Sequence, residues 1–245
     1  MQTGHAYSRW IARLEAVGDL AEGAREIITR LPIAVKHCPS EFNLARQGDV
    51  TTQCCLLVDG FLYRQKHASD GRRKILSFHV PGDIPDLYSM YVGPMDHTLT
   101  SAGPVVIGLI PHEVLVRDIA SSPEFRRIVL REILADAAIA REWLLNIGAR
   151  QAPARVAHLL CEITVRLQAV GLAKDLTFHW PVSQAEMADA SGISTVHANR
   201  VIQELRARDL VEWRGRNVTV LDWDGLVAAA DFVPGYLHLE KSRTQ

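Results

Sequence analysis

The residues with the clearest chemical role lie in the C-terminal third of the chain. Ser183 and Glu186 have the spacing of a capping box, so a helix is predicted to begin at Ser183. Gly192 supplies the sharp turn that would end this helix, and Ser194 can cap a second helix that runs to about Arg208. Two short helices joined by a glycine-containing turn are typical of a helix-turn-helix.

The second helix would present hydrogen-bonding side chains at its N-terminal half, where a recognition helix meets base edges in the major groove. Asn and Arg side chains can form two-pronged hydrogen bonds with adenine and guanine, and a valine can contact a thymine methyl. The candidates for contacting bases or nearby phosphates are Ser194, Thr195, Val196, His197, Asn199 and Arg200. An ordinary helical hairpin with a polar surface fits these residues equally well.

A short β-hairpin is expected directly after the second helix, with strand-like segments at 210–213 and 218–221. The turn between them carries Arg214 and Arg216. A hairpin in this place is a wing, and its arginines would hold DNA phosphates, which position a protein without reading sequence. Ser183 and Gln184 would hold the DNA backbone in the same way. The order of helix, turn, helix and wing favours DNA binding over an ordinary helical hairpin.

The N-terminal half has the pattern of a small β-barrel or roll. Between residues 38 and 113, short apolar runs alternate with turns such as Asp59-Gly60, which is a strong hairpin signal. Before this region, apolar residues recur at three- and four-residue spacing, which predicts one helix over residues 9–31.

A long helix is predicted from about Pro123 to residue 150. Two sets of residues spaced seven apart would form an a/d seam that meets a partner chain, although one ordinary buried helix is the alternative. The seam residues are Leu130, Ile133, Ala137, Ala140, Leu144 and Ile147. Val129, Leu134 and Trp143 lie off this seam and are expected to pack on the β domain. Pro153 marks the start of the next domain.

This order of segments resembles the Crp/Fnr family of bacterial transcription regulators over nearly the whole chain. Short motifs carry the resemblance, and their shared order makes the set specific. In the N-terminal half they are Arg46-Gln47-Gly48-Asp49, Val58-Asp59-Gly60, Asp70-Gly71-Arg72 and Pro81-Gly82-Asp83. In the C-terminal half they are residues 182–188, Gly192-Ile193-Ser194 and Asn199-Arg200-Val201.

The resemblance implies an α+β fold with an N-terminal β-roll (a jelly-roll-like double-stranded β-helix), a long dimerisation helix and a C-terminal winged helix-turn-helix. The corresponding domains are a cyclic-nucleotide-binding-like sensor roll at 1–122, the helix and hinge at 123–150, and a DNA-binding domain with a C-terminal extension at 151–245. The family implies a homodimer on a palindromic site, controlled by a signal at the roll. Gene activation would also require a surface that contacts RNA polymerase.

The sensor roll departs from the cyclic-AMP-binding members of this family. Those members carry a Gly-Glu-Leu segment and a downstream Arg-Ser pair, whereas this chain reads Pro-Asp-Leu at 85–87 and Met-Asp-His-Thr at 95–98. An anionic nucleotide would meet Asp86 and Asp96 without the arginine that neutralises its phosphate. Cyclic AMP is therefore not expected to bind well, and the small-molecule effector is unknown. The candidate effector pocket comprises Gly82, Asp83, Asp86, Asp96, His97 and Thr98.

No cofactor or metal is predicted. The four cysteines lack the clustered spacing of an iron–sulfur site, and Cys54 and Cys55 are expected to pack on opposite faces of a strand. Cys38 before a proline leaves a haem site as an alternative. His79 and His97 are expected to be surface or turn histidines, although His97 beside Asp96 could titrate near neutral pH.

The composition is that of an ordinary globular protein, with 48% apolar and 22% charged residues. No apolar run reaches the roughly 18–20 residues that a membrane span needs, and no signal peptide is evident, so a reduced, cytoplasmic protein is expected. Two other functions stay open: a cupin-type metal-dependent β-barrel enzyme, and a cyclic-nucleotide-binding module without DNA activity. No spaced set of metal ligands and no nucleophile or phosphate-loop motif supports an enzyme.

The net charge of −1 results from 27 Lys and Arg residues against 28 Asp and Glu residues. Residues 200–216, however, hold five arginines against three acidic residues, a local charge of 5 − 3 = +2. This patch is modest. It predicts few phosphate contacts and a site selected more by sequence reading than by bulk attraction.

Overall fold

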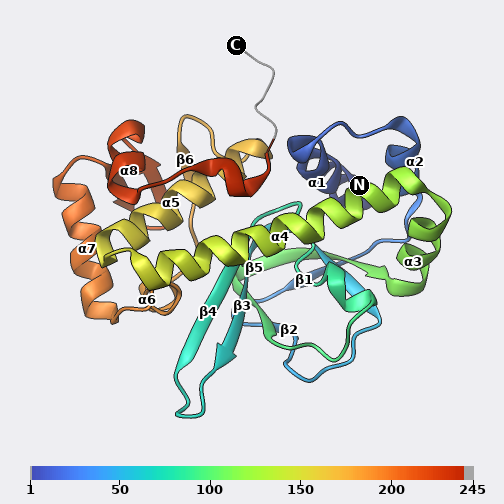
Figure 1. The fold of residues 1–245 in the computed structure, drawn as a ribbon, viewed down its shortest axis with the longest axis horizontal. Helices are drawn as coiled ribbons and strands as arrows, with labels where there is room; N and C mark the ends of the chain where they lie inside the picture. The colour runs from blue at the N-terminus through green and yellow to red at the C-terminus, as the bar shows by residue number, and fades with distance from the viewer. Residues whose placement is uncertain (1, 240–245) are drawn as a thin grey trace.

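An antiparallel sheet forms the N-terminal domain in the computed structural model, which describes residues 2–239 (Figure 1). Its strands pair in the order β1-β5-β3-β4, and the short β2 pairs with β5. The long β3 bends at Gly60, whose φ of 87° and close approach to the Pro104 carbonyl leave no room for a side chain. The strands are β1 Ala34–Cys38, β2 Asn43–Ala45, β3 Gln53–His67, β4 Arg73–His79 and β5 Thr98–Pro111. A 3-10 turn, η1 (Leu87–Met90), precedes β5.

Two helices, and not one, precede the sheet. The single helix expected over residues 9–31 is replaced by α1 (Gln2–Val17) and α2 (Glu22–Arg30). The chain leaves the helical path at Gly18 because glycine is a poor helix former, and Ala21 before α2 is extended. Trp10 of α1 packs edge-on against Phe125, with ring centroids 6.0 Å apart.

The long helix α4 (Pro123–Ala149) follows the short α3 (His112–Ser121) and runs past both domains (Figure 1). Ser122 caps it by accepting a hydrogen bond from the Phe125 amide. Val129 and Trp143 are buried as expected, but the prediction that Leu134 packs on the β domain is wrong, because its side chain is 65% exposed. Leu134 lies one turn from Leu130 and shares its outward face.

The C-terminal domain contains the two short helices and the wing, as predicted. A strand not expected from the sequence, β6, extends the wing to a three-stranded sheet in the order β6-β8-β7. Its elements are α5 Ala152–Ala169, β6 Thr177–His179, α6 Gln184–Ser191, α7 Thr195–Ala207, β7 Val211–Arg214, β8 Asn217–Val220, α8 Trp223–Ala230 and the 3-10 turn η2 Pro234–Leu237. The predicted α+β architecture is confirmed.

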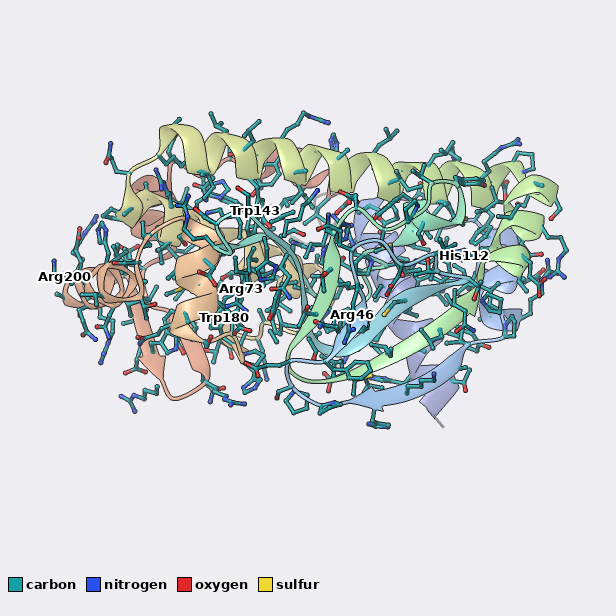
Figure 2. The ribbon with its side chains drawn as sticks, turned by 90° about the horizontal axis from the view of Figure 1, so that it is seen from below. Arg46, Arg73, His112, Trp143, Trp180 and Arg200 are labelled. Carbon is teal, nitrogen blue, oxygen red and sulfur yellow. The ribbon has the colours of Figure 1, made fainter. Side chains whose placement is uncertain are left out.

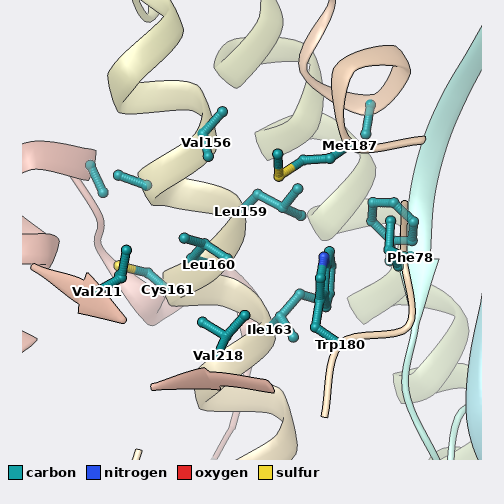
Figure 3. Close-up of a cluster of buried hydrophobic side chains, with 14 of the residues drawn as sticks. Phe78, Val156, Leu159, Leu160, Cys161, Ile163, Trp180, Met187, Val211 and Val218 are labelled. Carbon is teal, nitrogen blue, oxygen red and sulfur yellow. The ribbon is translucent and has the colours of Figure 1, made fainter. Parts of the chain in front are cut away.

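One hydrophobic core joins the two domains. Trp180, which is 1% exposed, packs against Phe61 and Phe78 of the roll, with ring centroids 5.4 Å apart in both pairs. Phe78 also contacts Trp143 of α4 at 6.0 Å. Figure 3 shows Phe78 and Trp180 beside Met187 and the α5 residues of the C-terminal domain. The domains are therefore held together by apolar packing as well as by the chain itself.

No helix among residues 2–239 is both long enough and apolar enough to cross a membrane.

Candidate functional site

The two short helices of the C-terminal domain are fixed by side-chain caps. The Ser183 hydroxyl accepts a hydrogen bond from the Glu186 amide at 3.2 Å, and the Glu186 carboxylate accepts one from the Ser183 amide at 2.7 Å. This completes the predicted capping box. Gly192 ends α6 with a φ of 67°, and Ser194 caps α7 by accepting from the His197 amide. The turn between the helices is thus set by local interactions.

Helix α7 buries one face and leaves the other open. The buried residues are the expected Ala198, Val201, Ile202 and Leu205. The exposed residues are the candidates Ser194, Thr195, Val196, His197, Asn199 and Arg200. Asn199 donates a hydrogen bond to the Gln184 side-chain oxygen at 3.2 Å, which links the two helices. Figure 2 shows Arg200 at the outer end of the molecule, far from the roll. Its guanidinium is therefore accessible to a large ligand.

The wing lies beside α7 and carries both predicted arginines. Arg214 forms an ion pair with Glu212 at 2.6 Å, so its charge is partly neutralised within the wing. Arg216 is exposed at the hairpin tip. A groove of about 450 Å³ separates the wing from α6 and α7. Its polar lining comes from Ser183, Gln184, Gln203, Arg206 and Arg216.

Sequence reasoning missed Arg206 as a member of this surface. It follows Gln203 by three residues, so it continues the outward stripe of α7, and that spacing could have identified it. Arg206 donates a hydrogen bond to the Gln203 side chain at 3.3 Å and lines the groove opposite Arg216. The two guanidinium groups place positive charge on both walls, as a phosphate-binding groove requires.

In the roll, a cavity of about 470 Å³ opens between β1, β3 and β5. Of the six candidate effector residues, only Asp86 lines it. The Asp86 side chain is buried and accepts a hydrogen bond from the Cys55 amide at 2.8 Å. Burial raises the pKa of Asp86 to about 6. The cavity wall is otherwise mostly apolar, with Phe42, Leu44, Ile107 and Leu109 among its side chains.

Three further candidates lie together away from this cavity. Asp96 is exposed, and its carboxylate lies 2.9 Å from His97 Nδ1 and 3.2 Å from the Tyr88 hydroxyl. Thr98 accepts a hydrogen bond from the Gln47 amide. Burial, with the nearby Arg64, lowers the pKa of His97, although Asp96 opposes this shift. His97 is therefore neutral at pH 7 in this environment.

His79 and His97 were expected to be surface or turn histidines, and neither is a surface residue, because both side chains are buried. His97 does lie in the bend before β5, whereas His79 is the last residue of β4. Burial lowers the pKa of His79 to about 4, so this imidazole is neutral as well. The Ser77 hydroxyl lies 3.0 Å from His79 Nε2. Both histidines are accommodated in the protein interior by hydrogen bonds, which their sequence positions do not indicate.

The remaining two candidates face the chain's own helices. Gly82 lies against α1 so closely that a Cβ atom would come within 2.7 Å of Arg13 Cβ. Asp83 is buried and forms ion pairs with Arg13 at 3.1 Å and Arg166 at 2.5 Å. Burial alone would raise the pKa of Asp83, but the two guanidinium groups hold it well below its usual range. Asp83 is thus ionised and already partnered.

Arg64 supplies a positive charge that the sequence did not suggest. Besides burial, its charge contributes to the pKa shifts of Asp86 and His97, so a cation lies near these two candidates although the segments at 85–87 and 95–98 contain no arginine. The Arg64 guanidinium is nevertheless occupied, since it donates to both oxygens of Asp136 on α4 at 2.8 and 3.0 Å and to the Pro85 carbonyl. Arg64 and Asp136 are 72 residues apart, and no local pattern pairs them.

The predicted seam on α4 is divided between two environments. Leu130 is 51% and Leu144 75% exposed, and Ala140 is also exposed. Ala137 and Ile147 are half-buried. Ile133, in contrast, packs on the N-terminal core, so it faces its own chain. The exposed apolar face of α4 is therefore formed by Leu130, Leu134, Leu144 and Leu145. This set includes Leu134, which the sequence analysis placed on the side that packs on the β domain.

The cysteines are buried thiols. Cys54 and Cys55 belong to different hydrophobic clusters on the two sides of β3, as expected for adjacent strand residues. Burial raises the pKa of both thiols. Within residues 2–239, no group of three or more His, Cys, Asp and Glu side chains is arranged to hold a metal ion.

The burial of Asp86 generates a prediction about stability. Its pKa rises from 3.8 to about 6, so the folded state binds this proton more tightly than the unfolded state, and stability is lost as pH rises through that range. Asp86→Asn keeps an acceptor for the Cys55 amide without the charge. We expect the variant to be more stable than the parent at pH 7.5, by up to about 3 kcal/mol, and the difference to vanish near pH 4. Urea unfolding at both pH values measures this, and a less stable variant at pH 7.5 would contradict it.

Comparisons with known proteins match both halves of the chain. Residues 35–122 match the cyclic nucleotide-binding domain, and residues 154–229 match the Crp-like helix-turn-helix domain. FixK2 from Bradyrhizobium japonicum has a similar structure, with a TM-score of 0.73 at 20% identity over 81% of this chain and 98% of that chain.

Curated relatives extend over about three quarters of the chain. The transcriptional activator protein FnrA of Stutzerimonas stutzeri is 26% identical over 76% of this chain and 76% of its own length. The nitrogen fixation regulation protein FixK of Bradyrhizobium diazoefficiens is 25% identical over 76% of this chain and 77% of its own. These relatives are transcription regulators and not enzymes. With both domains matched in the same order, the chain is a DNA-binding transcription regulator of the Crp/Fnr family.

Proposed function

We propose that this regulator binds a palindromic DNA site as a homodimer and does not respond to cyclic AMP. The observation that carries the proposal is the exposed outer face of α7 beside an arginine-bearing wing. We assign residues 1–122 to sensing, residues 123–150 to dimerisation and residues 151–245 to DNA binding.

The apolar outer face of α4 supports pairing with a second copy. Leu130, Leu134 and Leu144 are 51%, 65% and 75% exposed, and leucines exposed to this degree along one helix are typical of an interface. The small side chains of Ala137 and Ala140 between them favour close approach of two helices. A two-fold axis along α4 would present two copies of α7 to half-sites about one helical turn of DNA apart.

The contacts divide into two kinds. Thr195, Val196, His197, Asn199 and Arg200 are the candidates for base contacts, because they lie on the exposed N-terminal half of α7. Phosphate contacts are assigned to the walls of the groove between α7 and the wing. They comprise Ser183, Gln184, Arg206 and Arg216 of the groove lining, together with Arg214 of the wing, which lies outside that lining. Base contacts select the sequence, and phosphate contacts position the protein.

The arginines beside the candidate effector residues already have partners within the protein. Arg64 is occupied by Asp136 and Pro85, and Arg13 by Asp83. The cavity with the buried Asp86 at its wall has a mainly apolar lining. Its one Lys or Arg side chain is the exposed Lys36, which lacks the fork of donors that an arginine offers to a phosphate.

Isothermal titration calorimetry tests the assignment against cyclic AMP. We expect no measurable heat of binding with micromolar nucleotide, because the arginines beside the candidate effector residues are held by Asp136 and Asp83 and cannot neutralise the phosphate. Saturable binding with a low-micromolar Kd would contradict the proposal.

A change at the exposed face of α4 tests the dimer. Leu144→Lys introduces a charge in each of two facing helices, and we expect monomers by light scattering. Leu221→Lys alters a leucine that is 54% exposed in the C-terminal domain, away from α4, and should leave the oligomeric state unchanged. A Leu144→Lys protein that scatters light as a dimer would remove the α4 interface.

Two arginine variants test the division of DNA contacts. Arg200→Ala should cost about 1–3 kcal/mol on the preferred duplex and relax the preference at one base pair. Arg216→Ala should weaken binding to all sequences alike and reduce the slope of log K against log salt by about 1. Both are measured by fluorescence anisotropy on matched and single-mismatch duplexes. Equal behaviour of the two variants would contradict the assignment.

A further inference from the structure

Asp83 lies at a junction of three parts of the chain. It belongs to the Pro81-Gly82-Asp83 turn of the roll, and its carboxylate is bonded from two directions. Arg13 of α1 approaches Oδ1 at 3.1 Å, and Arg166 of α5 approaches Oδ2 at 2.5 Å. Arg13 and Arg166 are 70 and 83 residues away along the chain, so this turn joins the N-terminal helix to the DNA-binding domain.

The Arg166 side chain makes further contacts that cross the domain boundary. It donates to the Phe78 carbonyl of β4 at 2.9 Å and to Glu162 of its own helix at 3.0 Å. Glu162 is fully buried and accepts hydrogen bonds from Trp143 of α4 and from Tyr236, the latter at 2.8 Å. The network therefore ties the roll, α4, α5 and the C-terminal segment together.

The ionic network lies beside an apolar interface. The apolar interface holds the two domains together, and the ionic network restricts the angle between them. The packing of Trp180 on Phe61 and Phe78 favours contact between the domains, but apolar burial has no preferred direction. A guanidinium in charge-assisted hydrogen bonds to a carboxylate and a carbonyl has a fixed geometry. Because Asp83 and Arg166 are almost completely buried, rotation of the domain would break their ion pair without access to water, and would leave Asp83 with Arg13 alone and Arg166 with Glu162 alone.

A second ion pair across the same boundary is more accessible to water. Arg73 of β4 and Asp189 of α6 are 2.7 Å apart, and both side chains are about one-third exposed. Figure 2 shows Arg73 near Trp180, between the roll and the DNA-binding domain. Exposed pairs contribute little to a conformational preference, so the Asp83–Arg166 pair is the stronger orienting contact.

We propose that Asp83 and Arg166 are positioning residues for DNA binding, whose ion pair sets the angle at which the winged helix-turn-helix is held on the roll and α4. In the dimer, this angle fixes the spacing and orientation of the two recognition helices. The docked arrangement leaves the outer face of α7 exposed, so it is the DNA-binding arrangement. The inference rests on the proposed dimer on a palindromic site.

The test compares a palindromic duplex, selected in vitro with the parent protein, with a duplex that contains one half-site. Arg166→Met removes the interdomain ion pair without altering a DNA-facing residue. We expect its affinity for the palindrome to fall at least about tenfold, because two half-sites can no longer be bound together without strain. Its half-site affinity should stay within about twofold of the parent, since each recognition helix is intact.

Arg13→Met is the matched control. It also removes one guanidinium from buried Asp83, but Arg13 lies in α1 and has no bond to the DNA-binding domain among its described contacts. Both variants should lose thermal stability, and only Arg166→Met should change the ratio of palindrome to half-site affinity. A purely structural role for the Asp83 cluster would change this ratio in both variants or in neither, and either result would overturn the inference.

A second variant and the parent protein provide two further measurements. If Arg166→Met does not fold, Asp83→Asn removes the charge while keeping an acceptor, and its palindrome to half-site ratio should fall in the same direction. An unchanged ratio would overturn the inference. The parent protein itself tests the proposed function, because equal affinity for both duplexes would contradict the dimer on a palindromic site, whatever the variants do.

Discussion

The burial of Trp180 against Phe61 and Phe78 is the interaction on which the arrangement of the molecule depends. It joins the aromatic side chains of the roll and of the DNA-binding domain in one core, with Trp143 of α4 at its edge. Two domains linked only by a short connection would be expected to move relative to each other. Here the connection at residues 150–151 is short, and the apolar contact holds both domains on the same side of α4 (Figure 2). This contact keeps the DNA-binding domain against the roll, and the angle between the exposed face of α7 and the exposed leucines of α4 is then left to the Asp83–Arg166 ion pair.

Local signals were sufficient to predict the DNA-binding half. The Ser183–Glu186 capping box, the left-handed Gly192 and the Ser194 cap each depend on residues within four positions, and all three are present. Ion pairs between residues that are far apart in the sequence were not predicted. Arg64 and Asp136, or Asp83 and Arg166, are brought together by the fold across 72 and 83 residues, and neither pair has a spacing that sequence reasoning could detect.

The division of α4 between two environments has a simple cause. Two helical stripes can be drawn through Leu130, Ala137 and Leu144. One stripe adds the residues three positions after each of them, and the other adds the residues four positions after each of them. The first stripe contains Ile133 and is apolar throughout, whereas the second contains Leu134 but also Arg141. The apolar pattern therefore favoured the first. In the structure Ile133 packs on the N-terminal core, while Leu134 and Arg141 face outward. The seven-residue pattern predicted that one apolar face of this helix is exposed, but it did not predict correctly which of its residues lie on that face.

The close packing of Gly82 on Arg13 has a consequence for how this turn of the roll can be controlled. The guanidinium groups that bind Asp83 belong to the same chain. Their effective concentration at Asp83 is therefore set by the fold and does not depend on the protein concentration. A diffusible anion or cation would have to displace a tethered competitor and leave a buried charge behind. The Asp83 carboxylate is therefore bound by Arg13 and Arg166 in every folded molecule, whatever the concentration of a metabolite.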